Sequence, residues 1–584
     1  MSRPSNYDKL PTIQAGNEQD CAKGWEEIGN VLIAGLPESS GVICVECYPG
    51  AFTDRIEAAL QSVLAPSIII RTSDLLKDPH DLRAVLSPYL GSDPVFGRMN
   101  GITIQDYFDP ARLESARRQI ESNCMQRLLV IGVGAALLCN LPGLIVYADM
   151  ARWKIQRRWR NNEIGNLGLD NAGDSIGKKY KCGYFVEWRA ADRLKKTLLP
   201  RLDFLLDTND SAAPKMIGGN IFRRALCTAS QQPFRVVPYF DPGPWGGHWM
   251  EEVCDLPRDR PNHAWCFDCV PEENSLLLGF GNTRVEVPAI DLVFAHPHEL
   301  LGESVHARFG TEFPIRFDFL DTMGGGNLSL QVHPLTEYIQ DQFGMHYTQD
   351  ESYYLLDAGE DATVYLGLRD SADPAELLSD LRKAQEGNFV FPAERYVNIW
   401  PARKHDHFLI PAGTIHCSGK NSMVLEISAT PYIFTFKLWD WGRLGLDGKP
   451  RPIHIDHGEA NIQWDRNTEW VRDHLVNRIK PVSSGDGWTE ESTGLHEREF
   501  IETRRHWFRE SVSHNTNGTV NVLNLVEGDE VVVESPSSSF PPFIVHYAET
   551  FIVPAAVGAY TIRPYGQSID KQCATIKAFV RSSA

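Results

Sequence analysis

The sequence predicts a multidomain protein in which an α/β domain with a mainly parallel sheet precedes a mostly antiparallel β region. The chain has 584 residues, which at ~150 residues per domain is enough for several domains. Its first part alternates continuous apolar runs with helical stretches, a pattern typical of strands that are covered on both faces. Beyond about residue 225, short alternating runs are broken by Gly, Pro, Asn and Asp, as in β sandwiches and barrels.

The first domain is predicted to span residues 1–225. The apolar runs GVICVEC and SIIIRT read as buried strands, and the amphipathic stretches between and around them read as helices. The predicted elements are, in order, a helix at 21–35, a strand at 41–47, a helix over DRIEAALQSVL, a strand at 67–72, a helix near 110–122, strands at 128–133 and 144–148, and a helix near 151–160.

Residues 128–148 could be either a membrane helix or buried strands, because they are almost wholly apolar and about long enough to cross a bilayer. Asn140, Pro142 and two glycines interrupt this run, and an aspartate follows it at once. We therefore predict two buried strands, 128–133 and 144–148, rather than a membrane helix.

The remaining chain is predicted to form a β domain over 226–482 and a smaller β domain over 483–584. One helix is predicted within it at 373–386, and the polar stretch 483–494 is predicted to be a linker. The predicted strands are FRVVPYF, VEVPAIDLVF, LSLQVHP, SYYLLD, ATVYLGL, HFLIPAG, MVLEIS and YIFTFKLWDW, followed by VNVLNLVEGDEVVVES, HYAETFIVPAAVGAYTI and ATIKAFVR.

Composition narrows the possible partners and location. Apolar residues make up 42% and charged residues 23%, which excludes collagen, coiled coil and wholesale disorder. The balance of 57 Lys+Arg against 76 Asp+Glu gives a net charge of -19, which disfavours nucleic acid and anionic membranes as partners. Twelve cysteines and a polar first segment predict a cytoplasmic protein with reduced thiols. The sequence predicts no oligomeric state.

A set of possible metal ligands begins in the run LSLQVHP. Residues i and i+2 of a strand face the same side, so Gln331 and His333 point together. Glu351 follows at the head of SYYLL, and His416 lies in IPAGTIHCSG. Two imidazoles, a carboxylate and an amide oxygen suit zinc with one coordination position left open. Spacing alone is also compatible with surface or core groups that bind no metal.

These motifs resemble those of class I phosphomannose isomerases, which belong to the cupin fold. LSLQVHP, the acid before SYYLL, and FLIPAGTIHCSG match the family's metal motifs in order. Further matching pieces cover roughly 235–584: GPWGGHWM, PIRFDFLDT, VLEIS, FKLWDWGRLGLDGKPRPIHI and ETFIVPAAVGAYTI. The resemblance implies that the metal ligands are Gln331, His333, Glu351 and His416, with one zinc ion per chain.

The resemblance also implies the reaction and its residues. The family interconverts mannose 6-phosphate and fructose 6-phosphate through an enediol, with the metal acting as a Lewis acid. Glu426 in VLEIS becomes the candidate acid/base, and a structural strand carboxylate is its alternative. Arg443 in WDWGR becomes a candidate for stabilising oxyanion charge, and an ion pair with Asp440 is its alternative. Lys437 occupies a further basic position of the family.

Three departures from the family's pattern bear on the substrate. Gln349 and Asp318 stand where the family usually has lysines, and Lys437 stands where it often has arginine. Because the site has fewer basic residues than is usual in the family, the sequence supports a phosphorylated sugar as substrate less strongly. Isomerisation of a neutral aldose and a non-catalytic sugar-binding or regulatory role therefore remain as alternatives to a sugar-phosphate isomerase.

Other metal-like patterns are weaker. His405 and His407 form an i, i+2 pair, but the ligand set above already fills one site, so a polar strand entry is favoured. Cys44 and Cys47, like Cys266 and Cys269, have CxxC spacing. More than two hundred residues separate the two pairs, whereas a zinc ribbon needs them ~15–20 residues apart. Buried, inert thiols are predicted.

The first domain resembles nucleoside or uridine kinase-like P-loop domains, as a degenerate member. A buried strand, a Tyr-Pro-Gly turn and a helix from about Thr53 occupy the place of a phosphate-binding loop. Residues 46–55 nevertheless contain one glycine and no lysine, so the GxxxxGK[ST] cradle is absent. The basic helix ARWKIQRRWR, with Arg152, Lys154, Arg157, Arg158 and Arg160, could meet a phosphate or be a solvated helix face.

Overall fold

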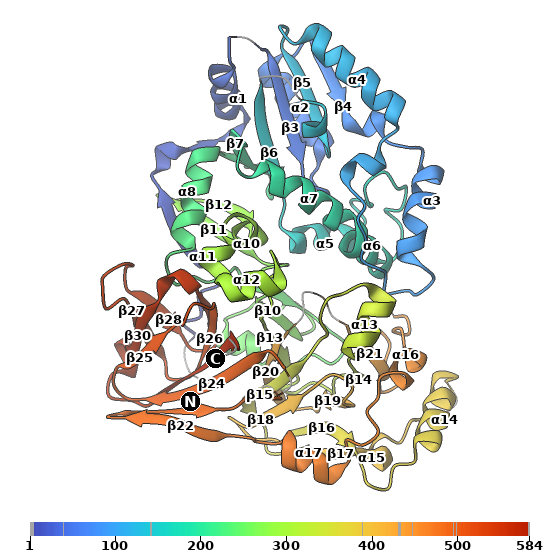
Figure 1. Cartoon of the computed structure of the whole chain (residues 1–584), viewed down its shortest axis with the longest axis vertical. Coiled ribbons are helices and arrows are strands. Elements are labelled where there is room, and N and C mark those ends of the chain that lie inside the picture. Colours follow the sequence, from blue (N-terminus) through green and yellow to red (C-terminus); the bar gives the residue numbers. More distant parts are fainter. Residues whose placement is uncertain are drawn as a thin grey trace. The chain divides into compact units, whose positions relative to one another are not determined.

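The structure is a computed structural model that describes residues 5–38, 40–139, 143–387, 389–429, 432, 434–446, 448–494, 496–497 and 499–581 (Figure 1). The chain divides into two compact units. Unit 1 comprises Met1–Pro11, Ser230–Glu272 and Pro297–Ala584, and unit 2 comprises Thr12–Ala229 and Glu273–His296. The division into three domains at residues 225 and 482 stays a prediction, because compactness alone does not define it.

Unit 2 is built on a seven-stranded sheet with the order β2-β8-β7-β6-β3-β5-β4. Five neighbouring strands run parallel: β3 (Val42–Cys47), β4 (Ile68–Arg71), β5 (Leu128–Gly132), β6 (Leu144–Asp149) and β7 (Phe204–Asp207). Two antiparallel strands, β8 (Lys215–Gly218) and β2 (Cys21–Lys23), extend one edge and make the sheet mixed. The two strands predicted within 128–148 are confirmed, while Asn140 and Pro142 lie outside the described residues.

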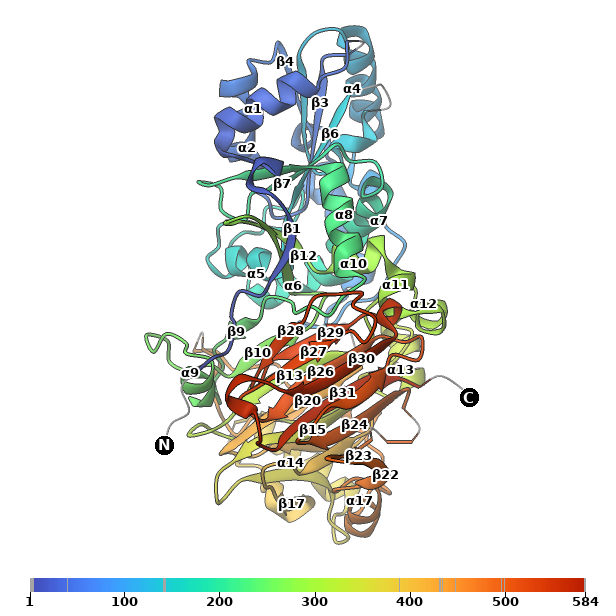
Figure 2. The same ribbon diagram turned by 90° about the vertical axis from the view of Figure 1, so that its left-hand side faces the viewer.

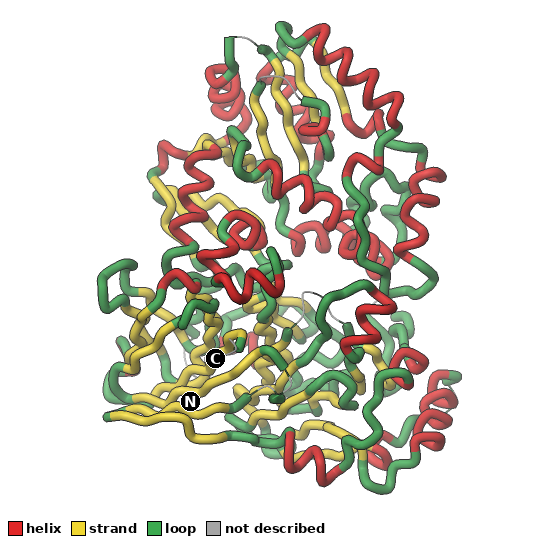
Figure 3. Tube along the Cα trace, in the orientation of Figure 1, coloured by secondary structure: helices red, strands yellow, loops and turns green. Residues whose placement is uncertain are grey.

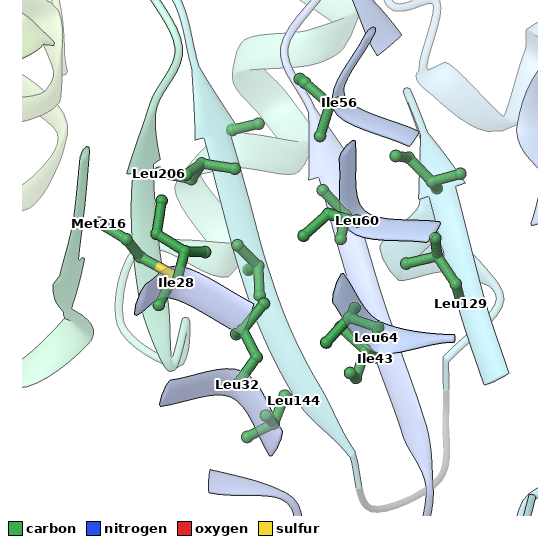
Figure 4. Packing of buried hydrophobic residues seen from close by; sticks show 14 of the residues in the cluster. Ile28, Leu32, Ile43, Ile56, Leu60, Leu64, Leu129, Leu144, Leu206 and Met216 are labelled. Carbon is green, nitrogen blue, oxygen red and sulfur yellow. The ribbon is translucent and has the colours of Figure 1, made fainter. Parts of the chain in front are cut away.

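Helices pack against this sheet through apolar faces, because their apolar residues recur at helical spacing. Ile56, Leu60 and Leu64 lie on one face of α2, and Ile28 and Leu32 lie on one face of α1. Figure 4 shows both helices packing these side chains onto the strands of the sheet. The helices of the unit up to residue 229 are α1 (Gly24–Gly35), α2 (Thr53–Leu64), α3 (Pro79–Leu90), α4 (Pro110–Asn123), α5 (Arg152–Arg160), α6 (Ile176–Cys182), α7 (Trp188–Leu198) and α8 (Gly219–Ala229).

A second, three-stranded sheet completes unit 2. It contains β1 (Thr12–Gly16), β11 (Ser275–Phe280) and β12 (Thr283–Pro288). The strand predicted over VEVPAIDLVF is wrong in its second half, where α10 (Ile290–Ala295) forms instead. Pro288 has no amide hydrogen to continue the ladder, and the Asp291 carboxylate in the first turn of α10 binds the buried Lys195 ammonium at 2.8 Å.

The first β part of unit 1 contains two antiparallel sheets that carry most of the predicted strands (Figures 2 and 3). One sheet has the order β18-β15-β20-β13-β10-β9 and the other has the order β17-β16-β19-β14-β21. The first sheet comprises β9 (Tyr239–Asp241), β10 (Trp265–Cys269), β13 (Arg316–Asp321), β15 (Glu351–Ala358), β18 (His407–Ile410) and β20 (Ser422–Ser428). The second comprises β14 (Leu330–Val332), β16 (Thr363–Leu368), β17 (Val397–Pro401), β19 (His416–Ser418) and β21 (Phe436–Trp439).

The helices of unit 1 lie between these strands in the sequence. They are α9 (Trp249–Val253), α11 (Pro297–Leu301), α12 (Glu303–Phe309), α13 (Thr336–Phe343), α14 (Pro374–Gln385), α15 (Ala393–Tyr396), α16 (Ile455–Glu459) and α17 (Thr468–His474). Helix α14 confirms the helix predicted at 373–386. No helix among the described residues of either unit is long and apolar enough to cross a membrane.

The C-terminal β part of unit 1 contains two further sheets, of six and four strands. They are formed by β22 (Lys480–Gly485), β23 (Trp488–Ser492), β24 (Ile501–Phe508), β26 (Asn521–Glu527), β29 (Thr550–Val553) and β31 (Cys573–Val580), and by β25 (Val512–Asn515), β27 (Glu530–Glu534), β28 (Phe543–His546) and β30 (Ala559–Pro564). Side chains of both sheets share one apolar core that includes Phe508, Leu523, Val531 and Tyr560.

The linker predicted at 483–494 is wrong, because β22 and β23 pair there as a hairpin. Its turn contains Asp486 and Gly487, and Gly487 adopts a φ of 73°, which favours glycine. An Asp-Gly pair between two short polar runs is a hairpin signal. The exposure of β22 on all of its residues explains why its sequence looks like a linker.

Candidate metal centre and active site

Three strands bring the predicted metal ligands together. Gln331 lies in β14, directly opposite His416 at the start of β19. His333 follows β14, and Glu351 begins β15 in the other sheet. His333, Glu351 and His416 offer ligand atoms that lie within 4.8 Å of one another, and all three side chains are fully buried.

The Glu351 carboxylate lies between the two imidazoles. His333 Nε2 is 3.0 Å from Glu351 Oε2, and His416 Nε2 is 2.9 Å from Glu351 Oε1. The side-chain amide nitrogen of Gln331, Nε2, lies 3.2 Å from His416 Nε2. Donors that share one ion at ~2 Å would be spaced by a little over ~3 Å, so this grouping has the dimensions of a metal centre.

Hydrogen bonds orient both imidazoles toward the carboxylate. His333 Nδ1 lies 2.8 Å from the carbonyl oxygen of Phe434, and His416 Nδ1 lies 2.9 Å from that of Thr414. In a neutral ring whose Nδ1–H donates to a carbonyl, Nε2 is unprotonated, which is the form that binds a metal. The residues present therefore fit a divalent cation. His333 Nε2 and Glu351 Oε1 are buried and satisfied by no hydrogen bond among the described residues, which supports the same conclusion.

The pKa values of the side chains in this cluster depend on burial and on the neighbouring charges. Burial alone would raise the pKa of Glu351, but the adjacent histidines hold it well below its usual value. Burial lowers the pKa of His416, whereas Glu351 outweighs burial at His333 and raises its pKa. The carboxylate is thus held ionised, as a ligand must be.

Gln349 supports Glu351 where the resembling family usually has lysine. Its Nε2 donates to Glu351 Oε2 at 2.9 Å, and its Oε1 accepts from the backbone amide of Phe434 at 2.9 Å. Because Phe434 also holds His333 through its carbonyl oxygen, a single residue connects two of the candidate ligands. The substitution therefore removes a charge but keeps a polar contact to the site.

A small cavity of about 70 Å³ extends from Gln331. Its wall combines aromatic rings with charged groups, as small-molecule sites often do. The lining residues are Trp245, Trp265, Phe267, Arg316, Asp318, Leu320, Leu328, Ser329, Gln331, Gln349, Glu426, Thr435, Lys437 and Arg451.

Two carboxylates face this cavity from neighbouring strands. Asp318 in β13 lies directly opposite Glu426 in β20. Burial raises the pKa of Asp318 to about 6, and burial together with Glu351 and Asp318 raises that of Glu426 well above its usual value. Arg316 neutralises part of this charge through a contact of 2.8 Å to Asp318. A carboxyl group whose pKa is raised in this way is suited to accept and release a proton during a reaction.

The predicted basic residues fall into two positions. Lys437 lines the cavity, and burial together with Arg451 lowers its pKa to about 8. Arg443 is absent from the described lining: it binds Asp440 at 2.9 Å and the carbonyl oxygen of Asn327. The ion pair considered as its alternative is therefore present.

Arg451 takes the place that was expected of Arg443. It lines the cavity and contacts Asp440 at 2.9 Å. No sequence signal distinguished it as a site residue, although it lies within the matched segment FKLWDWGRLGLDGKPRPIHI. Trp245, in the matched segment GPWGGHWM, lies beneath its guanidinium at 5.0 Å.

The weaker candidates do not join the cluster. His407 is buried in β18, and burial lowers its pKa to about 3, while His405 contacts the Tyr354 hydroxyl. Neither belongs to a group of potential metal ligands among the described residues. The cysteines of both CxxC pairs form no disulfide and are buried, as predicted: Cys44, Cys47, Cys266 and Cys269.

The region compared with a phosphate-binding loop also has a defined structure. β3 ends at Cys47, Gly50 adopts a φ of 97°, and α2 begins at Thr53. The basic helix is only partly solvated: Arg158 is buried and donates to the carbonyl oxygen of Gly50, and Arg152 is buried on Asp192.

Comparison with known proteins relates the chain to two different groups. Residues 24–231 match a family described as "Domain of unknown function (DUF8485)". That description does not support the kinase-like interpretation of the first domain. The chain is similar to mannose-6-phosphate isomerase ManA of Bacillus subtilis (strain 168), with 25% identity over 225 residues, and to mannose-6-phosphate isomerase of Streptococcus mutans, with 27% identity over 214 residues.

These matches are partial. They cover 38% and 36% of this chain and 66% and 62% of the two relatives, which is less than two thirds of the relatives' length. Among solved structures, the mannose 6-phosphate isomerase from Bacillus subtilis superposes with a TM-score of 0.48 and 19% identity, covering 60% of this chain and 99% of that chain.

Proposed function

We propose that unit 1 is a zinc-dependent aldose–ketose isomerase that acts on a sugar phosphate, with mannose 6-phosphate as its leading substrate. The observation that carries the proposal is the convergence of two imidazoles and a carboxylate beside a cavity that holds the buried Glu426. The names of the relatives supply the substrate. The donor set of nitrogen and oxygen atoms, with room for a further ligand, is typical of catalytic zinc.

The reaction divides between the ion and the side chains. A zinc ion held by Gln331, His333, Glu351 and His416 would supply Lewis-acid polarisation of the substrate oxygens. Glu426 would move the proton between C1 and C2, because it lines the cavity and its pKa is raised. Lys437 and Arg451 would face the anionic oxygens, and Arg443 would position Asp440.

The proposal is tested by substrate turnover and by exchange of the C2 proton with solvent. Wild-type protein loaded with zinc should convert mannose 6-phosphate and introduce deuterium at C2 in D₂O. Glu426→Gln should keep its zinc and lose about 10²–10⁴-fold in kcat, whereas Glu360→Gln, at an exposed position, should behave as wild type. Sugar binding without exchange would favour the non-catalytic, regulatory alternative.

Isomerisation of a neutral aldose is the second candidate, and one observation favours it. Arg316 and Asp318 form a buried ion pair in the cavity wall, so neither charge is left free for a phosphate. An ion pair of this kind has no net charge, and its two groups can form hydrogen bonds with the hydroxyl groups of a sugar. Turnover of free mannose with no turnover of mannose 6-phosphate would select this candidate.

The ligand assignment has a separate test. His333→Ala should lose bound zinc together with turnover, while His407→Ala should retain zinc because His407 lies outside the cluster. Both residues are fully buried histidines, so the pair is matched in burial. Metal content is measured by elemental analysis after dialysis, and full activity of a metal-free His333→Ala protein would contradict the mechanism.

A further inference from the structure

Unit 2 contains a large cavity that the isomerase proposal does not use. Its volume is about 870 Å³, within the range of sites for drug-sized ligands. It is lined by the segments that follow three parallel strands: Ala51–Glu57 beyond β3, Arg71–Pro79 at the end of β4, and Gly132–Val133 at the end of β5. Ligands of open parallel sheets bind at these carboxyl ends.

Basic side chains gather at this cavity, and some of them lack a carboxylate partner. Arg71 pairs with Glu57, and Arg112 pairs with Asp78 at 3.2 Å. Lys77 instead donates to the backbone carbonyl oxygens of Asp106 and Phe108 and forms no ion pair among the described residues.

Two guanidinium groups meet at a phenylalanine in the cavity wall. The Arg55 guanidinium lies 4.0 Å and the Arg158 guanidinium 3.7 Å from the centre of the Phe52 ring. Arg158 is 7% exposed, and burial lowers its pKa to about 10; Glu163 opposes this shift, and the like charge of Arg55 adds to it. Neither arginine forms an ion pair among the described residues. Burying a cation is costly, and a further anion beside these two guanidinium groups would lower that cost.

The cavity also offers acceptors. Asp54 and Glu163 line it, and Thr53 and Ser73 add hydroxyl groups. A bare inorganic anion would meet repulsion from these carboxylates, whereas sugar or ribose hydroxyls would donate to them. The lining therefore suits a compound that carries both a phosphate and hydroxyl groups.

We propose that the cavity of unit 2 binds a small phosphorylated metabolite, whose phosphate contacts Arg55 and Lys77. The loop after β3 provides one glycine and no lysine, so this site is not a triphosphate cradle of the glycine-rich type. The proposal goes beyond the isomerase activity, because all of its residues belong to unit 2.

The test uses calorimetric titration of the full-length protein with three probes: inorganic phosphate, AMP and sulfate. AMP is expected to saturate with a Kd below about 1 mM and to bind more tightly than inorganic phosphate. Arg55→Gln with Lys77→Gln should weaken AMP binding by at least about tenfold, because each removed contact is a charge-assisted hydrogen bond. Arg224→Gln, which removes an exposed arginine on α8, is the matched control and should bind as wild type.

The outcomes separate a specific site from adventitious binding. Failure of AMP to saturate, equal affinity for sulfate and AMP, or unchanged binding by the double variant would each overturn the proposal. Arg55 is exposed, so the single variant Arg55→Gln, with its fold checked by circular dichroism, guards against loss of binding through misfolding. Because these variants leave the cluster of His333, Glu351 and His416 intact, isomerase turnover reports on the other proposal independently.

Discussion

Gln349 shows how one neutral side chain can organise a charged site. It holds the Glu351 carboxylate on one side and the Phe434 amide on the other, and the Phe434 carbonyl oxygen in turn holds His333. Groups that orient metal ligands in this way tune affinity without touching the ion. The neutral amide also leaves the cavity with one cation fewer than a lysine would.

We predict that Gln349→Ala lowers the affinity for zinc by about 10–100-fold. The substitution frees Glu351 Oε2 from its amide donor and leaves the Phe434 amide without its acceptor. Competition against a chromogenic chelator measures the affinity. Gln340→Ala, at an exposed position of α13, should match wild type, and an unaltered affinity of the Gln349 variant would show that the amide does not orient the ligands.

Glu46 is a buried carboxylate in the parallel sheet of unit 2. It accepts hydrogen bonds from the amides of Gly134 and Ala136, yet burial raises its pKa to about 8. In the unfolded chain its pKa is near 4.5. Between these values the folded state binds more protons than the unfolded state, so raising the pH destabilises the fold.

The stability of unit 2 should therefore fall as the pH rises from about 4.5 to about 8, by up to about 5 kcal/mol for this group. Glu46→Gln carries no titrating proton and should flatten that part of the profile. Denaturant unfolding followed by circular dichroism at several pH values measures the slope. An identical slope in the Glu46→Gln protein would exclude this carboxyl as the cause, with Glu26→Gln, an exposed change, as control.

At the scale of elements, α2 illustrates why the parallel sheet was predictable. Its residues Ile56, Leu60 and Leu64 recur at a spacing of four and lie against strands whose sequences are continuously apolar (Figure 4). Both signals are local, so they can be recognised without knowing the partners. The two strands within 128–148 could be separated by another local signal, the interruption of the apolar run by Asn140, Pro142 and two glycines.

Leu60→Ala should destabilise unit 2 by about 2–5 kcal/mol, because Leu60 is fully buried between α2 and the sheet and its truncation leaves a cavity. Ser62→Ala, on the exposed side of the same helix, should change stability little. Chemical denaturation of the two variants provides the comparison. Equal unfolding midpoints would contradict the packing of this helix.

Other elements could not be predicted, because their determinants are not local. β1 pairs with β11, and the sequence near Thr12 contains no signal for a partner strand more than two hundred residues away. The helix at Ile290–Ala295 depends on the buried contact of Asp291 with Lys195. The ligand set was named by resemblance, whereas Arg451 was missed because its role arises from where β21 and the following loop place it against Trp245.

At the scale of the molecule, the two units together comprise five segments of the chain, three in unit 1 and two in unit 2. Residues 273–296 belong to unit 2, although unit 1 segments flank them on both sides. Neither unit is therefore a simple consecutive piece of sequence. Each still has its own apolar core, around Leu60 in unit 2 and around Leu523 in the C-terminal part of unit 1.

Zinc binding should therefore stabilise one set of strands selectively. A ligand that binds only the folded state raises the free energy of opening for the segments that form its site. We expect zinc added to metal-free protein to slow amide hydrogen exchange in peptides that cover β14, β15 and β19, while peptides that cover β3 and α2 keep their rates. Mass spectrometry resolves these peptides. The His333→Ala protein serves as the control and should show no slowing, and protection that spread equally over β3 and α2 would refute the assignment of the ion to the cluster of unit 1.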